Sequence, residues 1–146
     1  MRWSNMARLL FSDEGRISRR DFWRFGLVAL ALAVVAILLA GPRRMVLAHA
    51  AYGIVMLYPS YCVFAKRLQD IDMSGLWAVV IVAIAAGDLV GGLGGIHGLL
   101  GHPAMPAWGR TGWSALSNAN IAVVFAGLGV IPGTAGANRY GPMPGQ

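Results

Sequence analysis

The sequence predicts an all-α membrane protein, a single polytopic membrane domain over residues 1–146, built as a bundle of about four transmembrane helices with a short amphipathic N-terminal segment. Hydrophobic residues make up 57% of the chain and charged residues only 12%, about half the roughly 25% of charged residues in soluble domains. The apolar residues gather in long runs, and basic residues bracket these runs. The transmembrane spans are expected at about residues 25–41, 45–65, 76–98 and 113–131.

Two features of the N-terminal part of the chain predict helices. Ser18 followed three residues later by Asp21 is a capping-box pattern, which places the start of a helix near Ser18, just before the first apolar run. We expect no cleavable signal peptide, because that run begins only after some two dozen residues that carry acids as well as bases. Further upstream, one helical face carries Trp3, Met6, Leu9 and Leu10. This face fits a short helix lying on the membrane surface, and a frayed terminus is the alternative.

The later spans are separated by recognisable breaks. Gly41 and Pro42 predict a tight turn after the first span, and Lys66 and Arg67 end the second. The third contains a carboxylate, Asp88, and a glycine-rich run, while the C-terminal tail is rich in glycine and proline and should be irregular. A three-span chain, in which the third segment re-enters or the fourth lies at the surface, is the alternative.

The distribution of basic residues predicts the orientation in the membrane. With four spans, nine lysines and arginines fall on the side of the two termini and three on the other side. The N- and C-termini are therefore expected in the cytoplasm. The three-span alternative would leave the C-terminal tail outside.

Three short blocks carry a family resemblance. They are FSDEGRISRRDFWRF before the first span, AKRLQDIDMSGLW between the second and third, and GTAGANRYGPMP at the end. Together and in this order, they resemble the YhaH-like family of bacterial inner-membrane proteins, also known as domain of unknown function 805 (DUF805), over nearly the whole chain. The resemblance implies a protein of the inner (cytoplasmic) membrane. It implies no activity, because the family has none assigned.

The resemblance rests on individual positions in each block. The matching residues are Gly15, Arg16, Ser18, Arg19, Arg20 and Trp23; Arg67, Leu68, Asp70, Ser74, Gly75 and Trp77; and Gly133, Gly136, Asn138, Arg139, Tyr140, Gly141 and Pro142. The departures are Lys66 for Arg, Gln69 for His, Asp72 for Gly, Leu76 for Trp and Ala135 for Pro.

Asp88 is the candidate titratable group inside the membrane. It lies twelve residues past Leu76, about 18 Å along a regular helix. Ionised side chains at such a depth are costly and often functional, so Asp88 could carry protons or pair with a basic group. The alternative is that the glycine run breaks the helix and leaves Asp88 hydrated.

Small residues recur every four positions in the third span, at Ala83, Gly87, Gly91 and Gly95. On a helix they form one smooth face that allows another backbone to approach closely. The helix packed there could be another span of the same chain, a second copy, or a foreign subunit.

A charged cytoplasmic cluster is expected where the blocks meet. Its members are Arg16, Arg19, Arg20, Arg67, Asp70 and Arg139. The cluster could bind anionic lipid or a partner protein. The alternative is a structural latch between the N-terminal arm and the connection after the second span.

No catalytic, metal-binding or cofactor-binding constellation is predicted. His97 and His102 are five residues apart, which does not bring two imidazoles together on one helical face. The serines have no base arranged beside them. Basic residues that bracket apolar runs favour lipid headgroups over nucleic acid. We therefore expect no nucleic-acid partner and no enzymatic activity.

The expected function is that of a small multi-pass inner-membrane protein of unknown biochemical activity. Its role would be that of a non-enzymatic accessory or structural subunit, packing against helices of another membrane protein or of a homo-oligomer. Membrane lipids are the other expected partners. The alternative is a small transporter or channel that uses Asp88.

Overall fold

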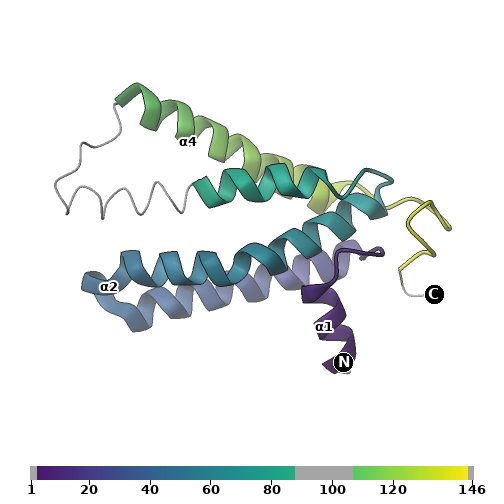
Figure 1. Ribbon diagram of the computed structural model, residues 1–146, viewed down its shortest axis with the longest axis horizontal. Helices are drawn as coiled ribbons and strands as arrows, with labels where there is room; N and C mark the ends of the chain where they lie inside the picture. Colours follow the sequence, from purple (N-terminus) through teal and green to yellow (C-terminus); the bar gives the residue numbers. More distant parts are fainter. Residues whose placement is uncertain (1–2, 88–106, 145–146) are drawn as a thin grey trace.

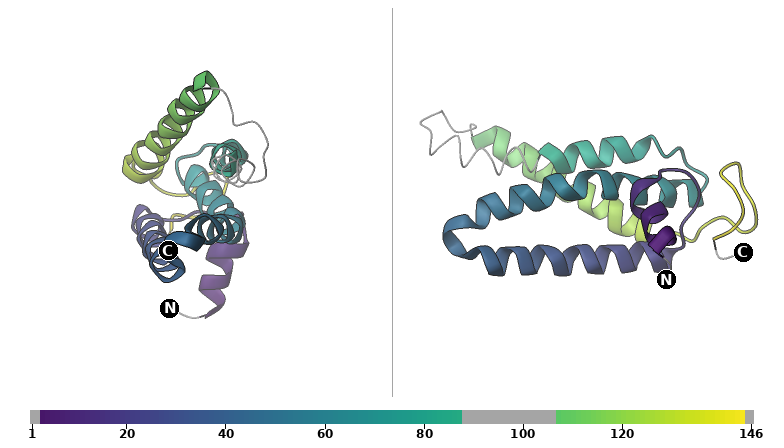
Figure 2. Two further views of the ribbon diagram at one scale, coloured as in Figure 1. Left: turned by 90° about the vertical axis from the view of Figure 1, so that its left-hand side faces the viewer. Right: turned by 60° about the horizontal axis from the view of Figure 1, so that its bottom comes forward.

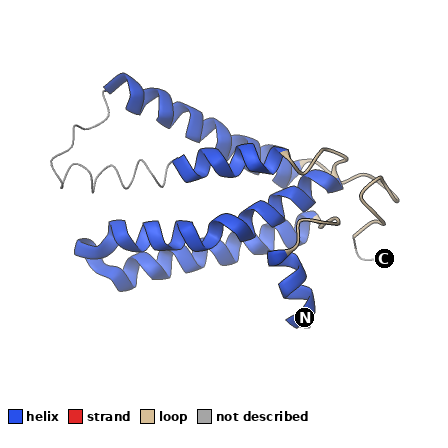
Figure 3. Cartoon of the chain, in the orientation of Figure 1, coloured by secondary structure: helices blue, strands red, loops and turns tan. Residues whose placement is uncertain are grey.

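The computed structural model describes residues 3–87 and 107–144, and the regular structure of these residues is helical (Figure 3). The helices are α1 (Trp3–Phe11), α2 (Arg19–Asp70), Trp77–Gly87, α4 (Ala107–Ala122) and η1 (Val123–Val130). η1 continues α4 with the wider π-helical turn. The predicted all-α class is confirmed for the described residues.

Helix α2 begins where the sequence predicts. Ser18 is its N-cap, and the Ser18 hydroxyl oxygen accepts a hydrogen bond from the Asp21 backbone N–H at 3.1 Å. The same hydroxyl donates to the Asp21 carboxylate at 2.9 Å. This side-chain cap satisfies one of the backbone donors that every helix leaves unpaired in its first turn.

α2 folds back on itself as a hairpin of two antiparallel limbs (Figures 1 and 2). The reversal lies between the apolar segments Arg19–Ala40 and Leu47–Asp70, as the sequence predicts. The backbone stays helical through residues 41–44, however, so the tight turn expected at Gly41 and Pro42 does not end the helix. Proline is tolerated in a helix where the carbonyl that its missing N–H frees finds another partner.

The backbone conformation at the C-terminus of α2 explains why an aspartate, Asp72, can occupy a position where the family pattern has glycine. Asp72 has a φ of +61°, in the left-handed region, which glycine adopts most easily and aspartate better than most residues. The N–H groups of Asp72 and Met73 donate to the carbonyls of Gln69 and Leu68 at 3.2 and 2.9 Å. These are the two bonds of a Schellman cap.

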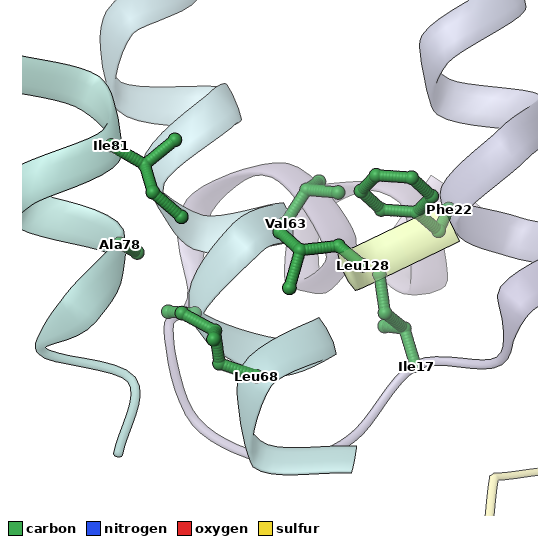
Figure 4. Close-up of a cluster of buried hydrophobic side chains, with 8 residues drawn as sticks. Ile17, Phe22, Val63, Leu68, Ala78, Ile81 and Leu128 are labelled. Carbon is green, nitrogen blue, oxygen red and sulfur yellow. The ribbon is translucent and has the colours of Figure 1, made fainter. Parts of the chain in front are cut away.

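A second pair of helices lies beside the hairpin. Trp77–Gly87 leads away from the end where α2 starts and finishes, and α4 with η1 returns to that end (Figure 1). The buried core also lies at this end (Figure 4). It comprises Ile17, Phe22, Val63, Ala65, Leu68, Ala78, Ile81 and Leu128.

Away from that core, many large apolar side chains are exposed. Leu38 and Leu39 of the first limb are 74% and 83% exposed. Arg19–Ala40 and Leu47–Asp70 are long and apolar enough to cross a membrane. Trp77–Gly87 and Ala115–Val130 are apolar but shorter, and residues 88–98 of the expected third span lie outside the described residues. The number of spans therefore stays a prediction.

A polar side chain links the two helices in each pair. The Tyr52 hydroxyl donates to the Ala29 carbonyl at 2.6 Å, between the limbs of α2. The Asn120 amide donates to the Ile81 carbonyl at 3.0 Å, between α4 and Trp77–Gly87. Between apolar surfaces, where the exposed Leu and Val side chains provide no directional contact, these bonds help to fix how the helices face each other.

Replacing Tyr52 by Phe should lower the free energy of unfolding by about 1 kcal/mol, because it removes a single half-buried hydrogen bond and little packing. The control is Tyr58→Phe, because the Tyr58 hydroxyl is exposed and its bond to the Phe11 carbonyl measures 3.5 Å. Thermal unfolding in a mild detergent measures both variants. Equal losses in the two variants would contradict a role for Tyr52 in holding the hairpin.

Candidate functional site

The guanidinium of Arg67 is fully buried on the last turn of α2. Its Nε donates to the Leu128 carbonyl at 2.6 Å, and one terminal nitrogen donates to the Ile131 carbonyl. The other terminal nitrogen forms an ion pair with Asp70, three residues further along the helix. All three nitrogens are thus paired, which removes most of the cost of burying the charge.

Asp70 shares its charge with a second arginine from a distant part of the chain. Arg16 lies in the loop before α2, and its Nε donates to the other Asp70 oxygen at 3.0 Å. The remaining Arg16 nitrogens donate to the carbonyls of Thr134 and Gly136 at 2.7 and 2.6 Å, with Gly141 at 3.4 Å. We call Arg16, Arg67 and Asp70 the clamp.

The clamp holds a net positive charge, because one carboxylate faces two guanidiniums. Backbone carbonyls of the C-terminal part of the chain supply the remaining negative potential. The side chains of Arg16 and Asp70 are only 1% and 4% exposed. At such burial, charged groups are stable only when paired with each other and fully hydrogen-bonded.

The C-terminal carbonyls of η1 receive donors from α2. Gly129 accepts from the Trp23 indole N–H at 3.0 Å, and Val130 from Arg19 at 3.1 Å. With the two carbonyls bound by Arg67, four consecutive groups that a helix end leaves unpaired are satisfied by side chains. Arginines also suit the negative end of a helix dipole.

The tail in turn binds the C-terminus of α2. The backbone N–H and hydroxyl of Thr134 both donate to the Asp70 carbonyl, at 2.8 and 3.1 Å. The Asn138 amide donates to the Gln69 carbonyl at 2.8 Å. At Gly133, a Cβ atom would lie 2.1 Å from an Asp70 carboxylate oxygen. Only glycine fits there, because the tail passes directly over the ion pair.

A related contact holds α1. The buried Lys66 ammonium donates to the carbonyls of Arg8 and Leu9 at 2.6 and 2.7 Å, near the C-terminus of α1. This cation satisfies two carbonyls at a helix end and complements the helix dipole there. α1 is thereby attached to α2 beside the clamp, and Figure 2 shows it lying across the direction of the limbs.

The structure separates the members of the predicted charged cluster. Arg16 and Arg67 both pair with Asp70. Arg19 lies beside them and donates to the Val130 carbonyl at the end of η1. Arg139 instead pairs with Asp72 at 3.2 Å on the surface, and Arg20 is exposed and forms none of the clamp contacts.

The other predicted site residues lie apart from the clamp. Ala83 is exposed and Gly87 half-buried on Trp77–Gly87. Asp88, Gly91 and Gly95 lie outside the described residues. Among residues 3–87 and 107–144, no three His, Cys, Asp or Glu side chains gather closely enough to hold a metal ion.

Sequence reasoning missed the roles of Lys66, Trp23, Thr134 and Asn138. All four bind backbone carbonyls of a segment far away in the sequence. Bonds of this kind produce no periodic pattern in the sequence and no pair of opposite charges, so the sequence does not reveal them. The only available signal was that each residue lies within one of the three blocks.

Comparison with known proteins places these blocks in a family. The family model described as "Protein of unknown function (DUF805)" matches residues 10–142. The uncharacterized protein YiiR of Escherichia coli strain K12 is 35% identical over 135 residues, which cover 90% of this chain and 85% of YiiR. YiiR of Escherichia coli O157:H7 matches to the same extent. No solved structure matches. The DUF805 resemblance is confirmed, whereas the label YhaH-like is not.

Two aspartates near the end of α2 provide a matched test of the clamp. Asp70→Asn should destabilise the protein by about 3–5 kcal/mol, because it leaves two buried guanidiniums without a counter-charge. Asp72→Asn removes an ion pair whose side chains are 49% and 60% exposed and should cost less than about 1 kcal/mol. Unfolding in mild detergent measures both. Similar small losses would mean that the clamp does not stabilise the fold.

Proposed function

The chain belongs to the DUF805 family of proteins of unknown function, and we propose that it is a non-enzymatic, multi-pass protein of the bacterial inner membrane. Its role is that of an accessory or structural subunit, whose outer helix faces pack against helices of a partner membrane protein or of a second copy. The observation that carries this proposal is the complete internal pairing of the clamp.

The pairing within the clamp fits a structural role, in which the clamp holds distant segments of the chain together. All guanidinium nitrogens of Arg16 and Arg67 and both Asp70 oxygens are engaged with groups of the same chain. A substrate would have to displace several of these buried bonds before any of the charges could act on it. Active sites instead present convergent polar groups to an open position.

The distribution of apolar side chains supports a membrane location. Soluble proteins bury their large apolar residues and expose their charges. In this chain the charges of the clamp are buried at one end, whereas Leu, Val and Ile side chains along both limbs of α2 are exposed over lengths that suit a bilayer. Lipid tails or partner helices would cover these surfaces.

The clamp also supports a topology in which both termini share one side. It ties the loop before α2, the end of α2 and the tail after η1 to one end of the molecule (Figure 1). Two helical pairs that each leave this end and return to it support an even number of crossings. The cytoplasmic side is proposed from the excess of basic residues.

Partner binding is the direct test of the accessory role. After mild-detergent extraction and affinity purification of the full chain, we expect a stoichiometric membrane protein or a second copy in the complex, measured by native mass spectrometry. The matched variant is Asp70→Asn, which should lose the partner because the helix faces no longer hold their relative positions. A wild-type protein that is monomeric and alone would overturn the accessory role. Ion flux in liposomes that is abolished by Asp88→Asn would support a transporter instead.

Reporter fusions test the topology. Fusions after Ser74 and at Gln146 should both report the cytoplasm, because the clamp places the α2 connection and the tail at the same end. A fusion near Pro103 should report the periplasm. A periplasmic signal from Gln146 together with a cytoplasmic signal from Ser74 would be incompatible with the clamp in the membrane.

A further inference from the structure

The first limb of α2 carries two arginines that bind neither the clamp nor η1, unlike Arg19. Arg20 and Arg24 are both exposed. They are four residues apart, so they lie one above the other on the same face of the helix. This separates them from Arg16 and Arg67, whose guanidiniums point inward and bind carbonyls.

An exposed apolar stripe continues the same face. Leu27, Ala31, Val34 and Leu38 follow Arg24 at alternating spacings of three and four residues, which keeps them in line on a helix. Leu27, Val34 and Leu38 are 63%, 46% and 74% exposed. No other described part of the chain covers these side chains.

The dimensions of this face suit one leaflet of a bilayer. From Leu27 to Leu38 the helix rises about 17 Å, close to the half of a roughly 30 Å hydrocarbon core that one leaflet contributes. Trp23 is partly exposed beside the two arginines, and tryptophan is typical of the level at which headgroups meet hydrocarbon. The arginines would therefore lie at headgroup height and the stripe along an acyl chain.

One acidic group also faces this site. The Asp21 carboxylate pairs with one terminal nitrogen of Arg24 at 3.2 Å, and its other oxygen accepts from Ser18. Arg24 is 52% exposed and keeps its other nitrogens free of this pair. Two arginines against one aspartate leave a net positive charge at the top of the stripe.

We propose that this face of α2, formed by Arg20, Arg24 and the apolar stripe below them, binds an anionic phospholipid, with the phosphate on the two guanidiniums and an acyl chain along Leu27 to Leu38. Guanidinium groups suit a phosphate because they offer planar, paired N–H donors. The proposal rests on the proposed membrane location, and it assigns the lipid contact to the first limb, which leaves the second pair of helices for partner proteins.

The test uses the full chain in neutral detergent, titrated with phosphatidylglycerol or with phosphatidylcholine, while native mass spectrometry counts the retained lipid. We expect the wild type to prefer phosphatidylglycerol. Arg20→Gln/Arg24→Gln should weaken that binding roughly thirtyfold, because each arginine lost removes one favourable contact with the anionic headgroup. The control is Arg44→Gln, an exposed arginine near the opposite end of the hairpin, which should bind as the wild type does.

Three other results of this titration would contradict the proposed lipid-binding site. A wild type without preference for phosphatidylglycerol, or an unchanged double variant, would show that these arginines do not recognise the headgroup. An equal loss in Arg44→Gln would indicate attraction by overall charge alone. Insertion of the wild type into phosphatidylcholine liposomes is measured separately. Failure to insert would refute the membrane location itself, whereas insertion without lipid preference would refute only the lipid site.

Discussion

Arg67 has no exposed surface, so its charge has to be neutralised by the chain itself. Asp70 supplies the counter-charge and at the same time binds Arg16. The remaining donors of the two arginines require carbonyl oxygens, which come from residues 128–141, more than 110 positions away from Arg16. Because unpaired buried charges are so unfavourable, the end of α2, the loop before it and the C-terminal tail all have to meet at one point. The arrangement of both helical pairs follows from that meeting.

The clamp gives a physical meaning to the three blocks that identify the family. The first block contributes Arg16 and the N-cap Ser18, the second contributes Arg67 and Asp70, and the third supplies the carbonyls that Arg16 binds. Gly133 belongs to the third block because a side chain there would collide with the Asp70 carboxylate. On this interpretation the blocks describe how the fold closes, which explains how a family can carry specific polar residues without an assigned reaction.

In the proposed membrane subunit, the polar and the apolar side chains have different roles. The buried charges fix the geometry of the helices at one end, and the exposed apolar faces of the limbs remain for lipid or partner helices. Rigidity at one end matters for such a role, because weak contacts between membrane helices depend on close and well-aligned surfaces. α1 lies across the limbs and is attached by Lys66, an orientation that suits a helix at the surface of a bilayer.

Local patterns in the sequence were enough to predict the helical class, the chain reversal between the two apolar segments of α2, the start of α2 near Ser18 and the family. These properties depend on local patterns: long apolar runs, a capping pair, glycine with proline, and three short blocks. Arg67 and Asp70 are three residues apart, a spacing at which opposite charges can pair on a helix. The folded chain was needed to show that Arg16 shares Asp70 and that Arg20 and Arg139 lie outside the clamp. It was also needed to show that Trp23, Thr134 and Asn138 bind helix-end carbonyls. The physical reason is that every residue offers the same backbone carbonyl, so the sequence cannot tell which carbonyls a distant donor will bind until the chain is folded.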